Sequence, residues 1–341
     1  MVDPQAAPGQ RTPLILDVDT GIDDALALLY ACASADAELV AVTALAGNAT
    51  ADNTERNTRA VLEAAGRSDI DVAVGRPMPL LRAVEITPET HGPRGLGYAD
   101  PPEPVRPRST AYGPQVIVDA ARARPGEITL VTLGPLTNLA VAALMEPALP
   151  RLLRRWIAMG GAFRVPGNTT PVAEWNIHCD PEAARIALRA WTTAIEADAT
   201  TPRALLLGLD VTERAQLMPA HLDALAVGAG HAANGPMLTL LGDALRFYFE
   251  FHAKYDGFYG AHIHDPLVVA AALDPALVRT EAAAVDVDAS GGPGDGQTIA
   301  DWRHVSGAVA NADVAVEADA AAFIERLIER VGDLAQSRAG H

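Results

Sequence analysis

Short apolar runs alternate with helical patterns along most of this chain, and this alternation restricts the fold more than any other feature of the sequence. Such runs are typical of buried parallel strands, and the stretches between them have the pattern of crossover helices. We therefore predict an α/β fold with a Rossmann-like, open, mostly parallel sheet flanked by helices. Ligands bind at the carboxyl ends of the strands in such sheets, so functional residues should directly follow the runs. The runs cover residues 14–16, 39–43, 72–74, 128–133, 155–159 and 204–209.

Two stretches interrupt this alternation. Residues 76–114 are rich in Pro and Gly and are too long for an ordinary connection, so they form either a working loop near the site, which we favour, or a disordered insertion. Residues 288–297 have the composition of a surface turn. Since neither an internal repeat nor a domain linker is visible, we expect one domain over residues 13–335 after a flexible N-terminal tail, residues 1–12.

The charge of the chain limits its partners. It has 26 basic and 43 acidic residues and a formal net charge of −17, so nucleic acid and anionic membranes would be repelled and small molecules are the expected ligands. Its two cysteines, Cys32 and Cys179, exclude a disulfide framework. The N-terminal residues lack the pattern of a secretory signal, and no apolar stretch is long enough to span a bilayer, so we expect a cytoplasmic protein.

Four carboxylates lie within eight residues directly after the first apolar run, at Asp17, Asp19, Asp23 and Asp24. Because concentrated anionic side chains repel one another, they need a cation, and oxygen ligands suit hard ions such as Ca²⁺ or Mg²⁺. Asp23 and Asp24 could instead only cap the helix that begins near Ala25. Capping leaves Asp17 and Asp19 unexplained, so the pattern favours a metal site.

Two later segments could complete such a site. Asp265, between His264 and a proline, is either a further ligand or a helix cap, and His264 is either a core histidine or an acid. The glycine-rich segment 160–168 and the residues Glu174 and Asn176 offer hydrogen-bond donors and acceptors for a polyhydroxylated ligand, although glycine and asparagine are also common in ordinary turns.

Taken together and in this order, the motifs resemble those of the inosine-uridine preferring nucleoside hydrolase family, over about residues 13–335. The motifs are DVDTGIDDA at residues 17–25, AGN at 46–48, HG at 91–92 with GL at 95–96, LGPLTN at 133–138, MGG at 159–161, EWN at 174–176 with DPEA at 180–183, and HDP at 264–266. The resemblance implies calcium-dependent hydrolysis of the N-glycosidic bond of ribonucleosides to ribose and free base. It also implies a homodimer or homotetramer.

The same resemblance implies roles for individual residues. The Ca²⁺ ligands would be the carboxylates of Asp19, Asp24 and Asp265 and the backbone carbonyl of Leu133. Asp19 would also act as the general base that takes a proton from the attacking water. His264 and His91 would contact or protonate the departing base. The ribose pocket, which favours an oxocarbenium-like transition state, would be lined by Asp23, Asn48, Met159, Asn168, Glu174 and Asn176.

The chain departs from the family pattern at a few positions. Thr20 stands where many members have Pro, and Trp175 stands where Phe is frequent. His264 stands in place of a Trp, which resembles the branch that accepts inosine and uridine or pyrimidine nucleosides. Tyr259 is our candidate for stacking on the base. Three further aromatic residues lie upstream of it, at Phe247, Phe251 and Tyr255. They could also stack on the base, or they form a buried helical stripe, for which they have the spacing.

Two rival functions remain open at this point. The sequence around Asp17 also fits the opening motif of haloacid dehalogenase-like phosphatases, with Asp17 as the nucleophile and Mg²⁺ as the cofactor. That family also needs a lysine and a late acidic pair, whereas Lys254 is the only lysine here. The other rival is a non-catalytic nucleoside- or calcium-binding protein, which would bind ligand and release no product.

Overall fold

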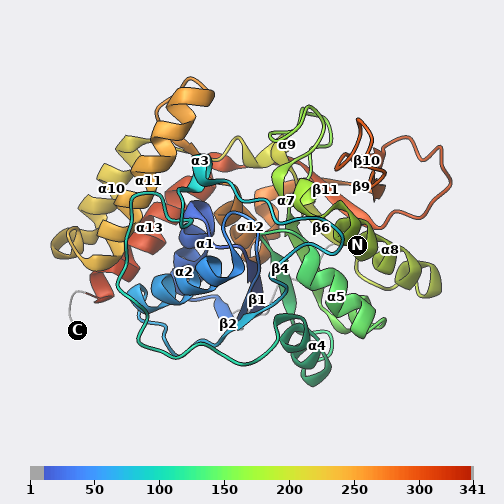
Figure 1. Cartoon of the computed structure of the whole chain (residues 1–341), viewed down its shortest axis with the longest axis horizontal. Coiled ribbons are helices and arrows are strands. Elements are labelled where there is room, and N and C mark those ends of the chain that lie inside the picture. The colour runs from blue at the N-terminus through green and yellow to red at the C-terminus, as the bar shows by residue number, and fades with distance from the viewer. Residues whose placement is uncertain (1–10, 339–341) are drawn as a thin grey trace.

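The computed structural model describes residues 11–338 and is built around a nine-stranded sheet with the order β10-β9-β11-β6-β5-β4-β1-β2-β3 (Figure 1). Most of the expected tail, residues 1–10, lies outside the described residues, and the first strand begins at Thr12. The strands are β1 (Thr12–Val18), β2 (Ala37–Ala44), β3 (Val72–Val74), β4 (Thr129–Thr132), β5 (Arg155–Met159), β6 (Ala204–Leu207), β9 (Val278–Val287), β10 (Thr298–Asp301) and β11 (Ala312–Ala318). A separate antiparallel pair consists of β7 (Gln216–Leu217) and β8 (Ala261–His262).

The predicted mostly parallel, Rossmann-like sheet is confirmed. All pairings from β3 across to β11 are parallel, and only β9 runs antiparallel to its neighbours β11 and β10. Residues 288–297, predicted as a surface turn, connect β9 and β10 as the loop of a hairpin. The chain leaves β1 toward β2 and β3 on one side and continues with β4 on the other. This reversal creates the crevice in which ligands of such sheets bind, at the carboxyl ends of β1 and β4.

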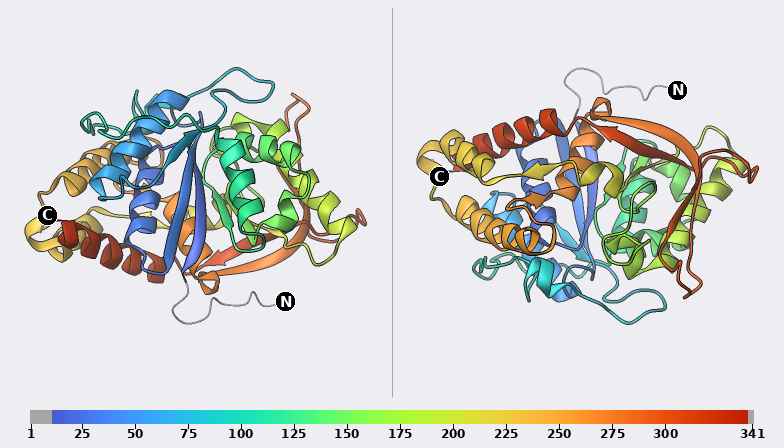
Figure 2. Two further views of the ribbon diagram at one scale, coloured as in Figure 1. Left: turned by 90° about the horizontal axis from the view of Figure 1, so that it is seen from below. Right: turned by 90° about the horizontal axis from the view of Figure 1, so that it is seen from above.

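Helices cover both faces of the sheet (Figure 2). Within residues 11–338 no helix is both long and apolar enough to cross a membrane. One face is covered by α1 (Ile22–Ala33), α2 (Ala51–Ala64), α9 (Leu209–Thr212), α10 (Pro219–Ala229), η1 (Gly230–Ala232), α11 (Pro236–Tyr255), α12 (His264–Leu273), η2 (Pro275–Leu277) and α13 (Ala320–Arg338). The other face is covered by α4 (Gly113–Ala123), α5 (Thr137–Met145), α6 (Leu149–Leu152) and α8 (Pro181–Ala197). Two short helices, α3 (Pro88–His91) and α7 (Trp175–Cys179), lie in the loops near the site.

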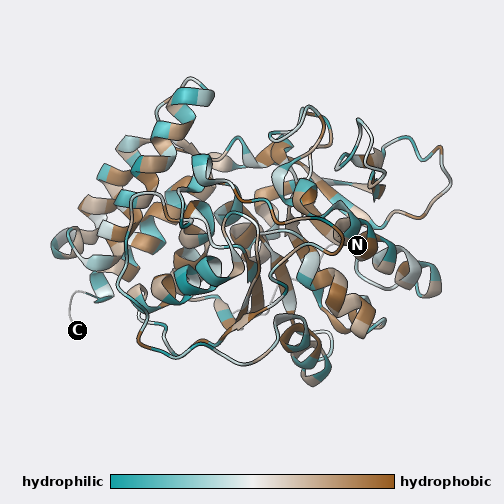
Figure 3. Ribbon diagram, viewed as in Figure 1, coloured by the Kyte–Doolittle hydropathy of each residue, from teal (hydrophilic) through white to brown (hydrophobic). Residues whose placement is uncertain are grey.

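The strands divide the interior into two hydrophobic cores. In β1, Leu14 and Leu16 belong to the core beneath α1 and α12, while Ile15 belongs to the core beneath α5 and α8. This alternation follows from the two-residue period of a strand. Hydrophobic segments accordingly gather on the central strands, whereas α2 is largely hydrophilic (Figure 3). With both faces buried, the polar residues that follow the strands are held by a rigid frame.

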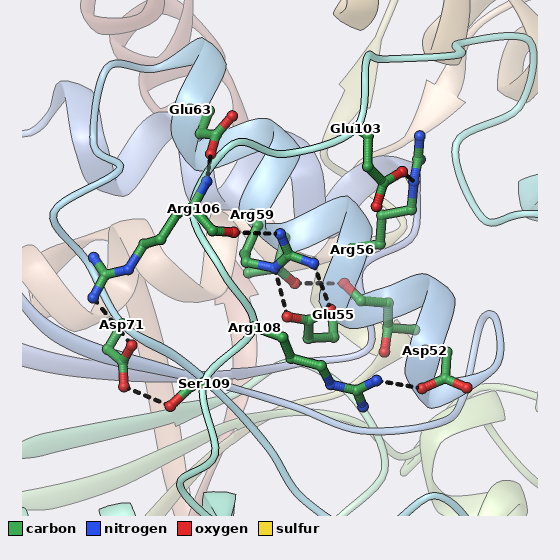
Figure 4. Close-up of polar contacts among 12 residues, drawn as sticks. Asp52, Glu55, Arg56, Arg59, Glu63, Asp71, Glu103, Arg106, Arg108 and Ser109 are labelled. Atoms are coloured by element: carbon green, nitrogen blue, oxygen red, sulfur yellow. Dashed lines mark hydrogen bonds and ion pairs between the residues drawn. The ribbon is translucent and has the colours of Figure 1, made fainter.

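The long segment between β3 and α4, residues 76–112, crosses over α2, and we call it the strap. Arg59 of α2 joins Glu55 through its Nε at 2.5 Å and donates to the backbone oxygen of Arg106 in the strap at 2.8 Å (Figure 4). Glu63 accepts hydrogen bonds from the strap amides of Val105 and Arg106. The strap is therefore ordered, and it carries His91 to the site, as the working-loop hypothesis predicts and the insertion hypothesis does not.

Candidate active site

Five aspartates converge at the carboxyl end of β1. Asp17 lies near the end of β1, and Asp19 directly follows the strand. Asp23 and Asp24 lie in the first turn of α1, and Asp265 lies in the first turn of α12. All five side chains are buried. Helices α1 and α12 pack together, so residues more than 200 positions apart in the sequence share one site. The structure thus unites the aspartates that the sequence singled out.

Burial and mutual repulsion raise the pKa values of the carboxyl groups in this cluster, so a bound cation would stabilise their ionised forms. Burial, followed by the charge of Asp24, raises the pKa of Asp19 well above its ordinary value. The pKa of Asp265 is likewise raised well above its ordinary value by burial and then by repulsion from Asp23 and Asp24. Burial also raises the pKa of Asp23 to about 7. A bound cation would reverse these shifts, because it stabilises the ionised form of each neighbouring carboxylate.

Asp17 and Asp19 have different surroundings although only one residue separates them. Asp17 Oδ1 accepts hydrogen bonds from Thr43 Oγ1 at 2.5 Å and from Asn138 Nδ2 at 2.8 Å, which tie β1 to β2 and α5. Asp19 Oδ2 accepts one from the Asn48 backbone at 2.7 Å. The second oxygen of each residue, Oδ2 of Asp17 and Oδ1 of Asp19, is buried and has no hydrogen-bond partner. Asp17 therefore stabilises the packing of β1, β2 and α5 around the site. This position disfavours its role as a phosphatase nucleophile.

The close approach of backbone to Asp19 requires glycine on two sides. A Cβ at Gly47 would lie 2.1 Å from Asp19 Oδ2, and a Cβ at Gly134 would lie 2.6 Å from Asp19 Oδ1. Both distances are far below van der Waals contact. The AGN and LGPLTN motifs thus have a steric reason for their glycines, which let the loops after β2 and β4 close around this carboxylate.

The tightest oxygen cluster consists of Asp23, Asp24 and Asp265, with one carboxylate oxygen of each within 4.8 Å of the other two. Asp24 also accepts hydrogen bonds from the backbone amides of Asp19 and Gly21, at 3.2 and 2.9 Å, so the expected capping of α1 is present. The side chain of Asp265 does not cap α12. The donor set of the cluster consists of oxygen atoms only, which fits a hard dication. Asp19, a predicted ligand, is not one of the three residues of this cluster, although its Oδ1 is buried and unpartnered.

A pocket of about 470 Å³ opens above this cluster, in the size range of small-molecule sites. Asp19 and Asp24 lie beneath it and are not among its lining residues. The other predicted metal and ribose residues do line it, as do both candidate histidines: Asp23, Asn48, His91, Leu133, Met159, Asn168, Glu174, Asn176, His264 and Asp265.

The predicted ribose residues are held rigidly by hydrogen bonds. Glu174 caps α7, and its carboxylate accepts from the amides of Asn176 at 2.8 Å and Gly161 at 2.9 Å. The Asn176 side chain donates to the carbonyl of Leu133 at 2.6 Å, which leaves that carbonyl a second lone pair. Asn168 accepts from the amide of Trp175 at 3.0 Å. Carboxylate and amide oxygens thus face the pocket in fixed positions.

The two candidate histidines are both neutral at physiological pH. His91 Nδ1 accepts a hydrogen bond from the amide of Ile22 at 3.1 Å, so the ring hydrogen lies on Nε2. Burial lowers the pKa of His91 to about 3. His264 Nδ1 lies 2.8 Å from Thr212 Oγ1, and burial lowers its pKa well below the ordinary value. A neutral His91 can donate a hydrogen bond to a ligand, but it is a poor source of a proton.

The aromatic side of the pocket differs from the expectation. Tyr259, predicted to stack on the base, is not among the lining residues and packs edge-on against Phe249. The lining rings from α11 are Tyr248, Phe251 and Tyr255. The alternative of a buried stripe at Phe247, Phe251 and Tyr255 is not what the structure shows, because Tyr255 is 56% exposed and the buried aromatic side chains are Tyr248 and Phe249, one and two positions after Phe247.

Several lining residues were missed by the sequence analysis. Glu89 and its neighbours on the strap carry no motif and reach the pocket only because α3 packs on α11. Three histidines within thirteen positions, ending at His264, could have drawn attention to His252 and His262. The missed residues are Thr87, Glu89, Thr90, Thr169, Glu213, Tyr248, His252, Asp256 and His262.

Comparisons with known proteins agree with this geometry. The chain matches the model of the inosine-uridine preferring nucleoside hydrolases over residues 14–325. The pyrimidine-specific ribonucleoside hydrolase RihA of Enterobacter sp. (strain 638) is 38% identical over 320 residues, which cover 94% of this chain and 97% of that protein.

Solved structures are similar over the whole fold. A purine-preferring ribonucleoside hydrolase from Gardnerella vaginalis superposes with a TM-score of 0.86 at 30% identity, covering 96% of this chain and 100% of that one. The plant nucleoside hydrolase PpNRh1 superposes with a TM-score of 0.84 at 31% identity, covering 94% and 98%. The chain therefore belongs to the inosine-uridine preferring nucleoside hydrolase family and is a ribonucleoside hydrolase.

Proposed function

We propose that this hydrolase is calcium-dependent and that Asp19 is its general base. The observation that carries the proposal is the buried, unpartnered Oδ1 of Asp19 beside the oxygen cluster of Asp23, Asp24 and Asp265. Asp19, Asp24, Asp265 and the carbonyl of Leu133 would hold the ion. Its charge would lower the pKa of the attacking water. Calcium suits a set of many oxygen donors in irregular positions better than the smaller Mg²⁺, which demands a near-octahedral shell.

The chain's own residues then divide the remaining work. Asp19 accepts the proton of the attacking water, because its neighbours hold the carboxylate without neutralising Oδ1. Glu174 and Asn176 hold the ribose hydroxyls, and the negative charge of Glu174 stabilises the positive charge that develops on the sugar. Asp23 belongs to the oxygen cluster and also lines the pocket, so it can serve the ribose as well as the ion.

The departing base would be met by the histidines. His264 and His91 donate hydrogen bonds to it, and the Thr212 hydroxyl fixes the ring of His264. We propose pyrimidine ribonucleosides and inosine as substrates. Support comes from His264 in place of a Trp and from the RihA relatives, whose names specify pyrimidine nucleosides. The relative from Gardnerella vaginalis is named purine-preferring, so a direct test of the base is needed.

The substitution Asp19→Asn tests the proposed mechanism. Asparagine keeps the shape of the side chain and an oxygen for the Asn48 amide, but it cannot accept the proton of water. We expect turnover of uridine at saturating calcium to fall by at least about 10³-fold, with the circular dichroism spectrum unchanged. Turnover within about tenfold of the unsubstituted enzyme would remove Asp19 from the role of base.

A further inference from the structure

A second cluster of metal-ligating side chains lies in the wall of the pocket, apart from the aspartates. It consists of His252 and Asp256 at the C-terminal end of α11 and of His262 in β8. One ligand atom of each residue lies within 4.8 Å of the other two. All three residues line the pocket. The proposed hydrolysis assigns no role to any of them.

Both histidines present a ring nitrogen that has no hydrogen-bond partner. His252 is 3% exposed, and its Nδ1 lies 2.6 Å from Asp256 Oδ2, while its Nε2 is buried and unpartnered. The Nδ1 of His262 is also buried and unpartnered. Buried polar atoms without partners are rare in folded proteins, so two within one cluster point to a missing ligand.

The surroundings favour the ring orientation that a metal requires. The rings of His252 and His262 lie edge to face, with their centroids 5.0 Å apart. A hydrogen bond with the backbone of Glu213 acts on His262. Carbonyl partners of this kind orient metal-binding histidines.

We propose that His252, Asp256 and His262 bind a transition-metal dication of the zinc class. Imidazole nitrogen with one carboxylate is the donor set that such borderline-soft ions prefer, whereas the aspartate cluster offers oxygen alone. The two sites therefore select different metals. Three protein ligands leave a coordination position open toward the pocket.

This second site would place an ion where the substrate must enter. Asp256 is 43% exposed at the mouth of the pocket, while the aspartate cluster lies at its floor. Ring centroids of His262 and His264 are 6.1 Å apart, so an ion on His262 lies close to the end of the pocket that we assign to the base. We infer that Zn²⁺ inhibits the enzyme, a consequence that rests on the proposed function, whereas the binding itself does not.

Metal binding to the full-length, calcium-saturated protein tests the site directly. Zn²⁺ affinity is measured by competition with a chromogenic chelator, and the absorption spectrum of the Co²⁺ form reports the geometry. We expect one tight Zn²⁺ site and the intense visible bands of four-coordinate cobalt. His262→Ala should weaken Zn²⁺ binding by more than the roughly 10- to 100-fold that loss of an outer partner costs. His231→Ala, which removes an exposed histidine of η1, is the matched control.

Asp256→Asn is the second variant, because this exposed side chain can be changed without disturbing the core. It should weaken Zn²⁺ binding, whereas the His231 variant should bind like the unsubstituted protein. Zn²⁺ should also inhibit uridine hydrolysis in the unsubstituted enzyme, and a zinc-selective chelator should restore it. Absence of a tight Zn²⁺ site, or equal affinity in the His262, Asp256 and His231 variants, would overturn the proposal. An enzyme inactive on uridine that still binds Zn²⁺ through these residues would contradict only the proposed function.

Discussion

Individual side chains in this site differ in function because their hydrogen-bond partners differ. Asp17 accepts from Thr43 and Asn138, both through Oδ1, so this oxygen holds strands and helix together. Asp19 keeps one oxygen free of any partner. His91 also has one occupied atom, because its Nδ1 accepts a hydrogen bond from the amide of Ile22. The role of each ionisable group is therefore set by which of its atoms the fold leaves available.

His264→Ala should affect substrates according to their leaving groups. The uracil of uridine is a poor leaving group and must be stabilised by a hydrogen bond or a proton as the glycosidic bond breaks. Nitrophenolate is a good leaving group and does not require this stabilisation. We expect kcat/KM for uridine to fall by about 10²-fold or more and that for 4-nitrophenyl riboside by less than about tenfold. The comparison is made with both substrates on one enzyme preparation. Equal losses would show that His264 does not assist departure of the base.

His91 should make the protein sensitive to acid. Its folded pKa of about 3 lies below the ordinary value of 6.5, so the unfolded chain binds more protons between these values and stability falls as the pH drops below about 6.5. His91→Asn removes this titration. Urea unfolding between pH 7 and 5 should therefore show a smaller loss of stability in the variant. Parallel pH profiles for the two proteins would contradict the buried, neutral state of His91.

At the residue scale, motifs predicted the floor of the pocket and not its mouth. Asp265, Glu174 and Asn176 occupy segments whose local sequence fixes the backbone, and all of them line the pocket. Tyr259 was misplaced because its position depends on how the end of α11 packs. A shift of one residue along a helix rotates a side chain by about 100°, which a pattern of aromatic spacing cannot resolve.

Among the elements, the strap shows how a segment with little regular structure becomes ordered. Arg59 and Glu55 form its anchor on α2, with side chains only 11% and 2% exposed, and Arg59 also donates to a strap carbonyl. The outer pair, Arg108 and Asp52, is 47% and 81% exposed. Ion pairs of these two kinds differ greatly in the cost of losing one partner.

Arg59→Met should therefore destabilise the protein far more than Arg108→Met. Loss of Arg59 leaves the buried charge of Glu55 without its partner, and we expect unfolding to become easier by about 3 kcal/mol. Loss of Arg108 should cost less than about 1 kcal/mol. Urea denaturation of both variants measures the difference. Equal stabilities would mean that the strap is held by its backbone packing and not by this anchor.

The order of elements was predictable because parallel strands have a strong local signal. The runs at residues 39–43 and 72–74 became β2 and β3 with small changes at their ends. The antiparallel pairs made by β9 were not foreseen, since β9 has a half-buried pattern and its pairing with β11 is set by the sheet edge. The polar strap likewise gave no signal of its ion pairs with α2, which depend on tertiary packing.

The whole molecule brings together charges that no local segment could hold. Asp23 and Asp24 come from α1 and Asp265 from α12, and the packing of these helices buries all three. Such a concentration of carboxylates costs stability unless a cation is bound. In the proposed mechanism, the fold therefore links metal binding, ribose binding and water activation at one switch point of the sheet. We propose that a calcium ion bound at this point is essential for turnover.

Release of ribose from uridine, cytidine, inosine and adenosine, measured with calcium and again after chelation, tests this claim most directly. We predict release with calcium, loss of at least about 10²-fold after chelation because the buried carboxylates then lack their counter-charge, and recovery when calcium is restored. Uridine, cytidine and inosine should be cleaved faster than adenosine. Undiminished release in the presence of the chelator would contradict the account.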